Sequence, residues 1–88
     1  MKYDVVFTDN AKESLMKMDA ITSGTIISWI EKNIIGKGDP RRNVDDLADE
    51  SAGVWRYRLG DYRLYAKIVD RDVIILAIKV RKSSTGDQ

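Results

Sequence analysis

The sequence contains no cysteine, no histidine and only one proline among its 88 residues. Without cysteine and histidine it can form no disulfide bond, no thiolate or imidazole metal site and no histidine-based acid/base pair. Any catalysis therefore depends on Arg, Lys, Tyr, Asp, Glu, Ser or Thr side chains. A chain of this length forms one small domain that buries about 60% of its unfolded surface.

Long hydrophobic runs are also missing from the chain. The segment 1–12 lacks the apolar run of a signal peptide, and no stretch reaches the roughly 18 apolar residues of a membrane span. We therefore expect a soluble, cytoplasmic protein without a membrane partner.

Charge is distributed unevenly along the chain, although the formal net charge is only +1. Residues 1–53 contain 7 Lys/Arg and 10 Asp/Glu, a balance of −3. Residues 54–82 contain 8 Lys/Arg and 3 Asp/Glu, a balance of +5. A basic C-terminal half suits a polyanionic partner, because neutralising phosphate groups releases counterions.

The apolar periodicity predicts one α+β domain over residues 1–82 and a disordered tail over residues 83–88. Residues 2–7 are expected to form a strand, and Thr8 or Asp9 to cap the helix that follows. The expected apolar stripe of this helix consists of Ala11, Leu15 and Met18.

A second helix is expected to begin at Thr22 or Ser23 and to end before the glycines that precede Pro40. The short connection between the helices favours an antiparallel helical hairpin on one face of a sheet. Residues 39–53 are expected to form an acidic connecting loop with a short turn near residues 44–47. The expected apolar side of the second helix consists of Ile26, Ile27, Ile30 and Ile34.

The segment VWRYRLGDYRLYAK, residues 54–67, predicts two strands joined by a two-residue Gly-Asp turn. This turn pairs Arg58 with Arg63 and Arg56 with Tyr65. Because side chains alternate along a strand, the two faces separate into an apolar and a basic one. The expected apolar face consists of Tyr57, Leu59, Leu64, Ala66 and Ile68. The expected basic face consists of Arg56, Arg58, Arg63, Tyr65 and Lys67.

The last strand is expected to follow a three-residue turn at residues 70–72, which places Val69 opposite Val73. This register brings Lys79 beside Arg63 and extends the basic face across a third strand. The expected core side of the last strand consists of Ile74, Leu76, Ile78 and Val80.

The pairing of Arg58 with Arg63 is unfavourable for the sheet, because like charges on neighbouring strands repel. One basic strand is often only a solvated face whose alkyl stems cover apolar neighbours. Here the basic residues recur on adjacent strands, and guanidinium groups match the geometry of phosphate. The face is therefore predicted to bind phosphate. The acidic residues of segment 45–50 match no strong metal-ligand motif, so no metal is expected.

The order of strand, helical hairpin and meander, with VWRYRLGDYRLYAKIVDRDVIILAIKV at its centre, resembles the RelE/ParE superfamily of type II toxin-antitoxin toxins, most closely its RelE branch. The resemblance covers nearly the whole chain, to about Val80. It implies a ribosome-dependent mRNA endoribonuclease in which a ribose 2′-hydroxyl attacks the adjacent phosphate and leaves a 2′,3′-cyclic phosphate. No cofactor is implied, because guanidinium groups can supply the positive charge that a dianionic phosphorane needs.

The resemblance also implies site residues. The two basic positions of the family's second strand fall at Arg56 and Arg58, and its arginine after the turn tyrosine falls at Arg63. The expected catalytic residues are Arg56, Arg58, Arg63 and Arg81. The expected substrate-binding residues are Tyr65, Lys67, Lys79 and Lys82.

The C-terminal segment KVRKSSTGDQ departs from the family pattern. Members usually continue with a basic segment and an aromatic or histidine-bearing tail that contributes proton transfer, and no tyrosine or histidine follows here. General acid/base catalysis is typically worth about 10²- to 10⁴-fold, so the resemblance implies a weakened enzyme. Tyr65 is the only tyrosine expected on the basic face.

The implied partners are a cognate antitoxin that covers the basic face, the ribosome and mRNA, and operator DNA only indirectly through the antitoxin. Two non-enzymatic alternatives stay open. One is a ParE-like inhibitor of DNA gyrase, and the other is a degenerate toxin that only binds its antitoxin.

Overall fold

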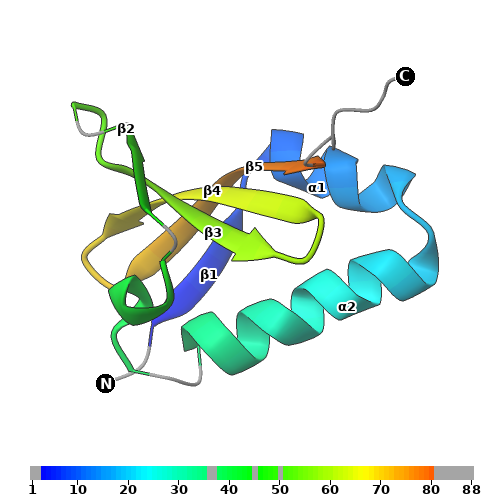
Figure 1. The fold of residues 1–88 in the computed structure, drawn as a ribbon, viewed down its shortest axis with the longest axis horizontal. Helices are drawn as coiled ribbons and strands as arrows, with labels where there is room; N and C mark the ends of the chain where they lie inside the picture. Colours follow the sequence, from blue (N-terminus) through cyan, green and yellow to red (C-terminus); the bar gives the residue numbers. More distant parts are fainter. Residues whose placement is uncertain (1–2, 36–37, 45, 50, 81–88) are drawn as a thin grey trace.

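A computed structural model describes residues 3–35, 38–44, 46–49 and 51–80, and it contains a five-stranded sheet with two helices against one face (Figure 1). The strand order is β1-β5-β4-β3-β2, with β1 parallel to β5 and the other neighbours antiparallel. The predicted α+β class and helical hairpin are confirmed. Within the described ranges, no helix combines the length and the apolar character that crossing a membrane requires. The elements are β1 (Asp4–Phe7), α1 (Asp9–Lys17), α2 (Ala20–Ile30), a π-helical turn (Glu31–Ile35), a 3₁₀ turn (Pro40–Asn43), β2 (Asp46–Asp49), β3 (Val54–Leu59), β4 (Tyr62–Val69) and β5 (Asp72–Val80).

Each helix begins at a side-chain cap. Thr8 caps α1, and its Oγ1 accepts a hydrogen bond from the Ala11 N–H at 3.2 Å, as one of the two predicted caps. Asp19 caps α2 and accepts a hydrogen bond from the Thr22 N–H at 2.8 Å. The prediction that α2 begins at Thr22 or Ser23 was therefore wrong, because the carboxylate of Asp19 starts the helix earlier.

The core lies between the helices and one face of the sheet. Ile27 is 41% exposed, which corrects its assignment to the apolar side of α2. It follows Ile26 directly, and adjacent helix positions do not share a face. Leu15 and Met18 pack against the core while partly exposed. The buried hydrophobic residues are Ala11, Ile26, Ile30, Ile34, Tyr57, Leu64, Ala66, Val73, Ile75 and Ile78.

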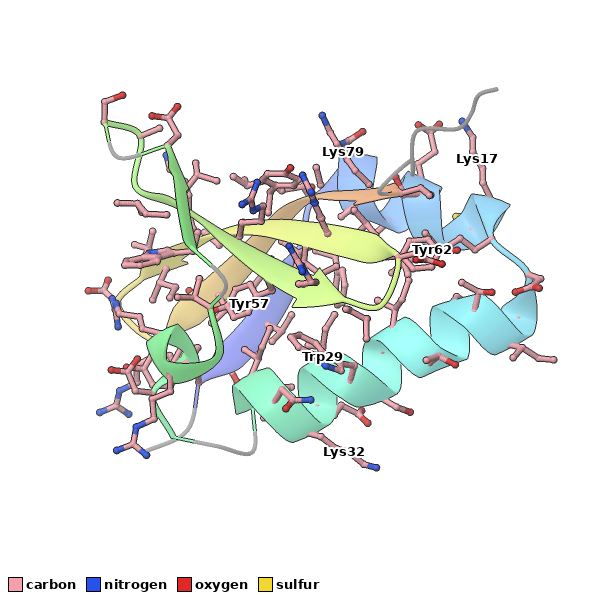
Figure 2. The ribbon with its side chains drawn as sticks, in the orientation of Figure 1. Lys17, Trp29, Lys32, Tyr57, Tyr62 and Lys79 are labelled. Carbon is pink, nitrogen blue, oxygen red and sulfur yellow. The ribbon has the colours of Figure 1, made fainter. Side chains whose placement is uncertain are left out.

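Tyr57 is a fully buried aromatic residue at the centre of β3. Its hydroxyl donates a hydrogen bond to the Pro40 carbonyl at 2.9 Å, which fixes the 3₁₀ turn to the core. Its ring lies edge-on to Trp29, with centroids 6.1 Å apart, and Figure 2 shows both side chains between the sheet and α2. Burial raises the pKa of Tyr57 to about 12.

Residues 39–44 and 46–49 contain more regular secondary structure than predicted. Asp39 caps the 3₁₀ turn, and β2 pairs with β3 through Leu47 opposite Trp55. The prediction of a connecting loop was wrong here. The β2 sequence DLAD is poor in strand-favouring residues, so its conformation depends on pairing with β3 rather than on local preference.

The β3–β4 hairpin has the predicted register. Gly60 adopts a φ of 56°, a left-handed conformation that glycine enters without steric strain. Arg58 pairs with Arg63, and Arg56 pairs with Tyr65. The predicted separation of an apolar and a basic face on these two strands follows from this register.

The β4–β5 turn differs from the prediction. Asp70 adopts a left-handed φ of 55°, so two residues form the turn and Val69 pairs with Asp72 instead of Val73. Aspartate tolerates this conformation better than most residues other than glycine. The core side of this part of β5 therefore consists of Val73 and Ile75, which corrects the assignment of Ile74 and Leu76 to the core.

A bulge in β5 restores the predicted register further along the strand. Ala66 pairs with Ile75, but the next pair is Tyr65 with Ala77, so Leu76 is an extra residue in β5. One extra residue moves every following side chain to the other face of the sheet. The second half of β5 thus keeps the predicted pairing although the first half does not.

The bulge is bonded to the start of α1. The Thr8 Oγ1 lies 2.9 Å from the Ile75 carbonyl oxygen and 3.1 Å from that of Leu76. The Thr8 N–H also donates to Ile75 at 3.1 Å, and the Asn10 side-chain amide donates to Leu76 at 3.1 Å. One threonine therefore caps a helix and satisfies carbonyl groups where the ladder is interrupted.

Replacing Thr8 by valine is expected to lower the free energy of unfolding by about 1–3 kcal/mol. The substitution removes the helix cap together with the bonds from the Thr8 hydroxyl to the bulge. Urea denaturation measures this change. Thr25→Val is the matched control, because the exposed Thr25 hydroxyl donates only to Ile21 within its own helix, at 2.9 Å. The control should change stability by less than about 0.5 kcal/mol. Equal stability of Thr8→Val and the parent would contradict this account of the bulge.

Tyr57→Phe is expected to lower stability by about 1 kcal/mol at neutral pH, because the bond to Pro40 is lost. The raised folded-state pKa means that an unfolded tyrosine ionises first as pH rises. The parent therefore loses stability relative to Tyr57→Phe between about pH 10 and about pH 12. Urea midpoints of both proteins at about pH 9 and about pH 11 test this sign. If the difference in urea midpoint between the parent and Tyr57→Phe does not shrink at the higher pH, the expected loss of stability is refuted.

Candidate functional site

The face of the sheet opposite the helices carries the predicted basic residues in cross-strand rows. In one row, Arg63 of β4 pairs with Arg58 of β3 and with Lys79 of β5. In the next row, Tyr65 pairs with Arg56 on one side and with Ala77 on the other. Figure 2 shows Lys79 projecting from the side of the sheet away from α2. We call this surface the basic face; its residues are Arg56, Arg58, Arg63, Tyr65, Lys67 and Lys79.

The structure thus brings together six of the eight residues predicted for the site. The other two, Arg81 and Lys82, lie outside the described residues, as does the predicted tail. Lys67 lies in a third row, opposite Ile74 of β5 and Val54 of β3. The basic face therefore spans three adjacent strands.

The β5 bulge decides that Lys79 belongs to the basic face. In the register of the first half of β5, Tyr65 would pair with Leu76, and Lys79 would then point to the core side. The extra residue shifts the pairing, so that Lys79 shares a face with Arg63. The sequence prediction reached this pairing through a longer turn, and it gave no sign of the bulge itself.

Lys79 also contacts an aromatic ring, a contact that the sequence analysis did not predict. Its Nζ lies 5.8 Å from the centroid of the Tyr65 ring, within the range of a cation–π interaction. Tyr65 and Lys79 are diagonal neighbours on adjacent strands, and the small Ala77 beside Tyr65 leaves room for the lysine stem. Tyr65 is thereby placed among the cations at the centre of the face.

Arg63 is the central cation of the basic face. It is half-buried between Arg58 and Lys79, and its Nε is enclosed without a hydrogen-bond partner in the described part of the chain. Three cations in one cross-strand row repel each other. A bound anion would relieve this repulsion and could accept hydrogen bonds from the guanidinium groups.

The basic face is an open surface rather than a pocket. One hollow, of about 540 Å³, runs along α2 and is lined by residues such as Gly24, Trp29 and Leu59. The described residues contain no group of three or more Asp or Glu side chains that could hold a metal ion. The arrangement therefore suits an extended polyanion that lies across the strands.

Comparison with known proteins identifies the class to which this fold and surface belong. The model of the family described as the ParE toxin of the type II toxin-antitoxin system, parDE, matches residues 5–85. A search of curated protein sequences found no match. The chain is a toxin of the RelE/ParE superfamily, as the sequence resemblance predicted.

Within that class, the chain belongs to the family of ParE toxins of type II toxin-antitoxin systems. Among solved structures it is similar to the RelBE2 toxin-antitoxin complex from Mycobacterium tuberculosis, at 29% identity and a TM-score of 0.78 over 92% of this chain and 100% of that chain. The fold is also similar to the RelE-RelB complex from Pyrococcus horikoshii, at 24% identity and a TM-score of 0.73 over 96% and 100% of the two chains. Isolated Escherichia coli RelE gives 15% identity and a TM-score of 0.72 over 94% and 88%.

Arg63→Gln is expected to leave the free energy of unfolding unchanged or to raise it by up to about 1 kcal/mol, because it removes the middle charge of a row of three. Urea denaturation at low salt measures the effect, which should shrink at high salt as charge repulsion is screened. Arg71→Gln, on the exposed β4–β5 turn, is the control for loss of one positive charge elsewhere. A clear loss of stability in Arg63→Gln alone would show that Arg63 is needed for folding.

Proposed function

We propose that this toxin is a ribosome-dependent mRNA endoribonuclease whose active surface is the basic face. The observation that carries the proposal is the row of Arg58, Arg63 and Lys79 across three strands, flanked by Arg56 and Tyr65. Like charges on neighbouring strands do not favour strand pairing, and a bound anion would offset their repulsion. The similarity to solved RelE toxins supports the same reading.

The proposed reaction needs little more than fixed positive charge. The ribose 2′-oxygen attacks the adjacent phosphorus, the bond to the 5′-oxygen breaks, and the product ends in a 2′,3′-cyclic phosphate. Guanidinium groups at Arg56, Arg58 and Arg63 would donate hydrogen bonds to the non-bridging oxygens, where negative charge increases in the transition state. Lys67 and Lys79 would hold the flanking phosphates. Arg81 and Lys82 are assigned the roles of catalytic and binding residue by sequence alone.

The proposed partners follow from the family. The solved relatives include toxin-antitoxin complexes, so we propose that a cognate antitoxin binds this chain and covers the basic face. An acidic or amphipathic segment would complement that surface. The toxin would act on mRNA bound to ribosomes in the cytoplasm and reach operator DNA only through the antitoxin.

A second candidate is a non-enzymatic inhibitor of DNA gyrase, and the family match to ParE toxins favours it. It predicts DNA damage signalling and inhibited supercoiling without mRNA cleavage. A degenerate toxin that only binds its antitoxin predicts neither effect. Supercoiling by purified gyrase, measured with and without the toxin, identifies a gyrase inhibitor, and the mRNA cleavage assay below distinguishes the nuclease from the degenerate toxin.

Arg63→Ala is expected to reduce mRNA cleavage at least about 10-fold, because removing one donor to the transition state typically costs about 3–4 kcal/mol. Primer extension on mRNA bound to programmed bacterial ribosomes detects the cuts. New stops in the decoding site should appear with the parent protein and fade with Arg63→Ala. Arg71→Ala, which removes a cation far along the hairpin, is the matched control and should cut like the parent.

Two results would contradict the nuclease assignment. One is a folded parent protein that produces no new stops. This result would favour a gyrase inhibitor or a degenerate toxin that only binds its antitoxin. The other is full cleavage by Arg63→Ala, which would place the active surface elsewhere.

A further inference from the structure

The proposed cleavage raises the question of which side chain protonates the leaving group. Breaking the bond between phosphorus and the 5′-oxygen leaves an alkoxide, which departs faster when a positioned acid donates a proton to it. The chain has no histidine and four tyrosines. A neutral phenol donates one proton and can accept it again. The tyrosines are therefore the candidates for this proton donor.

Three of the four tyrosines face the core. Tyr57 is buried, and its hydroxyl is bonded to Pro40. Tyr3 and Tyr62 pack against the hydrophobic core, and Figure 2 shows Tyr62 near the helices at the β3–β4 turn. Tyr65 alone lies on the basic face.

Tyr65 lies next to two arginines in the cross-strand arrangement of the basic face. Arg56 is its direct cross-strand partner on β3, and Arg63 is two residues away on the same face of β4. Directly paired residues have Cβ atoms about 4.5–5.5 Å apart, so a phosphate held by Arg56 lies within reach of the phenol. Lys79 sits against the ring, with its Nζ 5.8 Å from the centroid.

We propose that Tyr65 is the general acid of the cleavage reaction and that Lys79 is its positioning residue; the inference rests on the proposed nuclease function. The 2′-oxygen forms its bond to phosphorus and gives its proton to water. The bond from phosphorus to the 5′-oxygen breaks, and the Tyr65 hydroxyl gives its proton to that oxygen. The phenolate then takes a proton from water, so protons and charge balance over one turnover.

Lys79 contributes in two ways to this role. Its stem and ammonium group limit the orientations of the ring, and its positive charge lies near the phenolate that remains after proton donation. Lys79 reaches this place because of the extra residue in β5. A lysine could also donate the proton itself, and the experiment distinguishes that case.

Tyr65→Phe removes only the hydroxyl and keeps the ring against Lys79. Single-turnover cleavage of ribosome-bound mRNA is expected to slow about 10²- to 10³-fold, with little change in the toxin concentration for half-maximal rate. Tyr62→Phe is the matched control, because it makes the same change on the other face of the same strand. It should cleave like the parent. Urea denaturation checks that both variants are folded.

The decisive measurement replaces the bridging 5′-oxygen by sulfur. A thiolate leaves without protonation, so this substrate should be cleaved by Tyr65→Phe within about 5-fold of the parent, while the Arg63→Ala defect persists. Lys79→Met should be slowed on the oxygen substrate and Lys79→Arg should recover most of the rate, because arginine restores a cation near the ring.

The outcomes distinguish failure of the Tyr65 proposal from failure of the proposed nuclease function. Parent cleavage with an undiminished Tyr65→Phe rate overturns the general acid and leaves the nuclease intact. A Tyr65→Phe defect that sulfur does not rescue assigns the Tyr65 hydroxyl to a role other than proton donation and also overturns the proposal. If sulfur rescues Lys79→Met but not Tyr65→Phe, the lysine is the acid. No cleavage by the folded parent overturns both proposals.

Discussion

The arrangement of the basic face depends on one extra residue in β5, held by the side chain that starts α1. The bulge at Leu76 reverses the alternation of β5 at mid-strand. Its carbonyl groups are satisfied by Thr8, which follows β1 directly, and by Asn10 in the first turn of α1. Without the extra residue, Ile78 would leave the core and Lys79 would enter it. Burial of Ile78 and exposure of Lys79 therefore favour the same register, and this register decides which cations lie side by side across the strands.

The two faces of the sheet contribute oppositely to stability, because the core on one face stabilises strand pairing and the like charges on the basic face weaken it. Its other side supplies the core, where Tyr57, Leu64 and Ile78 are buried. On the open side, each cross-strand neighbour of Arg63 is another cation, which weakens the pairing of strands that the core holds together. A small domain has little stability to spare, so such a row persists only where packing on the other face compensates. The repulsion of like charges is thus a consequence of placing several cations within one short span of the sheet.

The sequence predicted those parts of the fold that follow from local signals. The Gly-Asp turn fixed the β3–β4 register, and with it the positions of Arg56, Arg58 and Arg63. Some errors arose where distant contacts decide. Strand β2 exists through its pairing with β3, and the β5 bulge depends on Thr8, about 68 residues away in sequence. The start of α2 was missed for a local reason, because Asp19 caps the helix ahead of the two residues that were predicted to do so. The pairing of Arg63 with Lys79 was predicted correctly because a longer turn and a bulge shift the register by the same amount.

Under the proposed function, the openness of the basic face explains why cleavage would require the ribosome. Two unit charges 4 Å apart interact by about 1 kcal/mol in water and by about 4 kcal/mol at an effective dielectric constant of 20. Cations on a sheet face that is open to water are therefore weak electrostatic catalysts by themselves. A surface that closes over mRNA and the basic face excludes water and strengthens each guanidinium–phosphate contact. An antitoxin covering the same residues would exclude the mRNA instead, so one exposed sheet face would provide both the proposed activity and the means to suppress it.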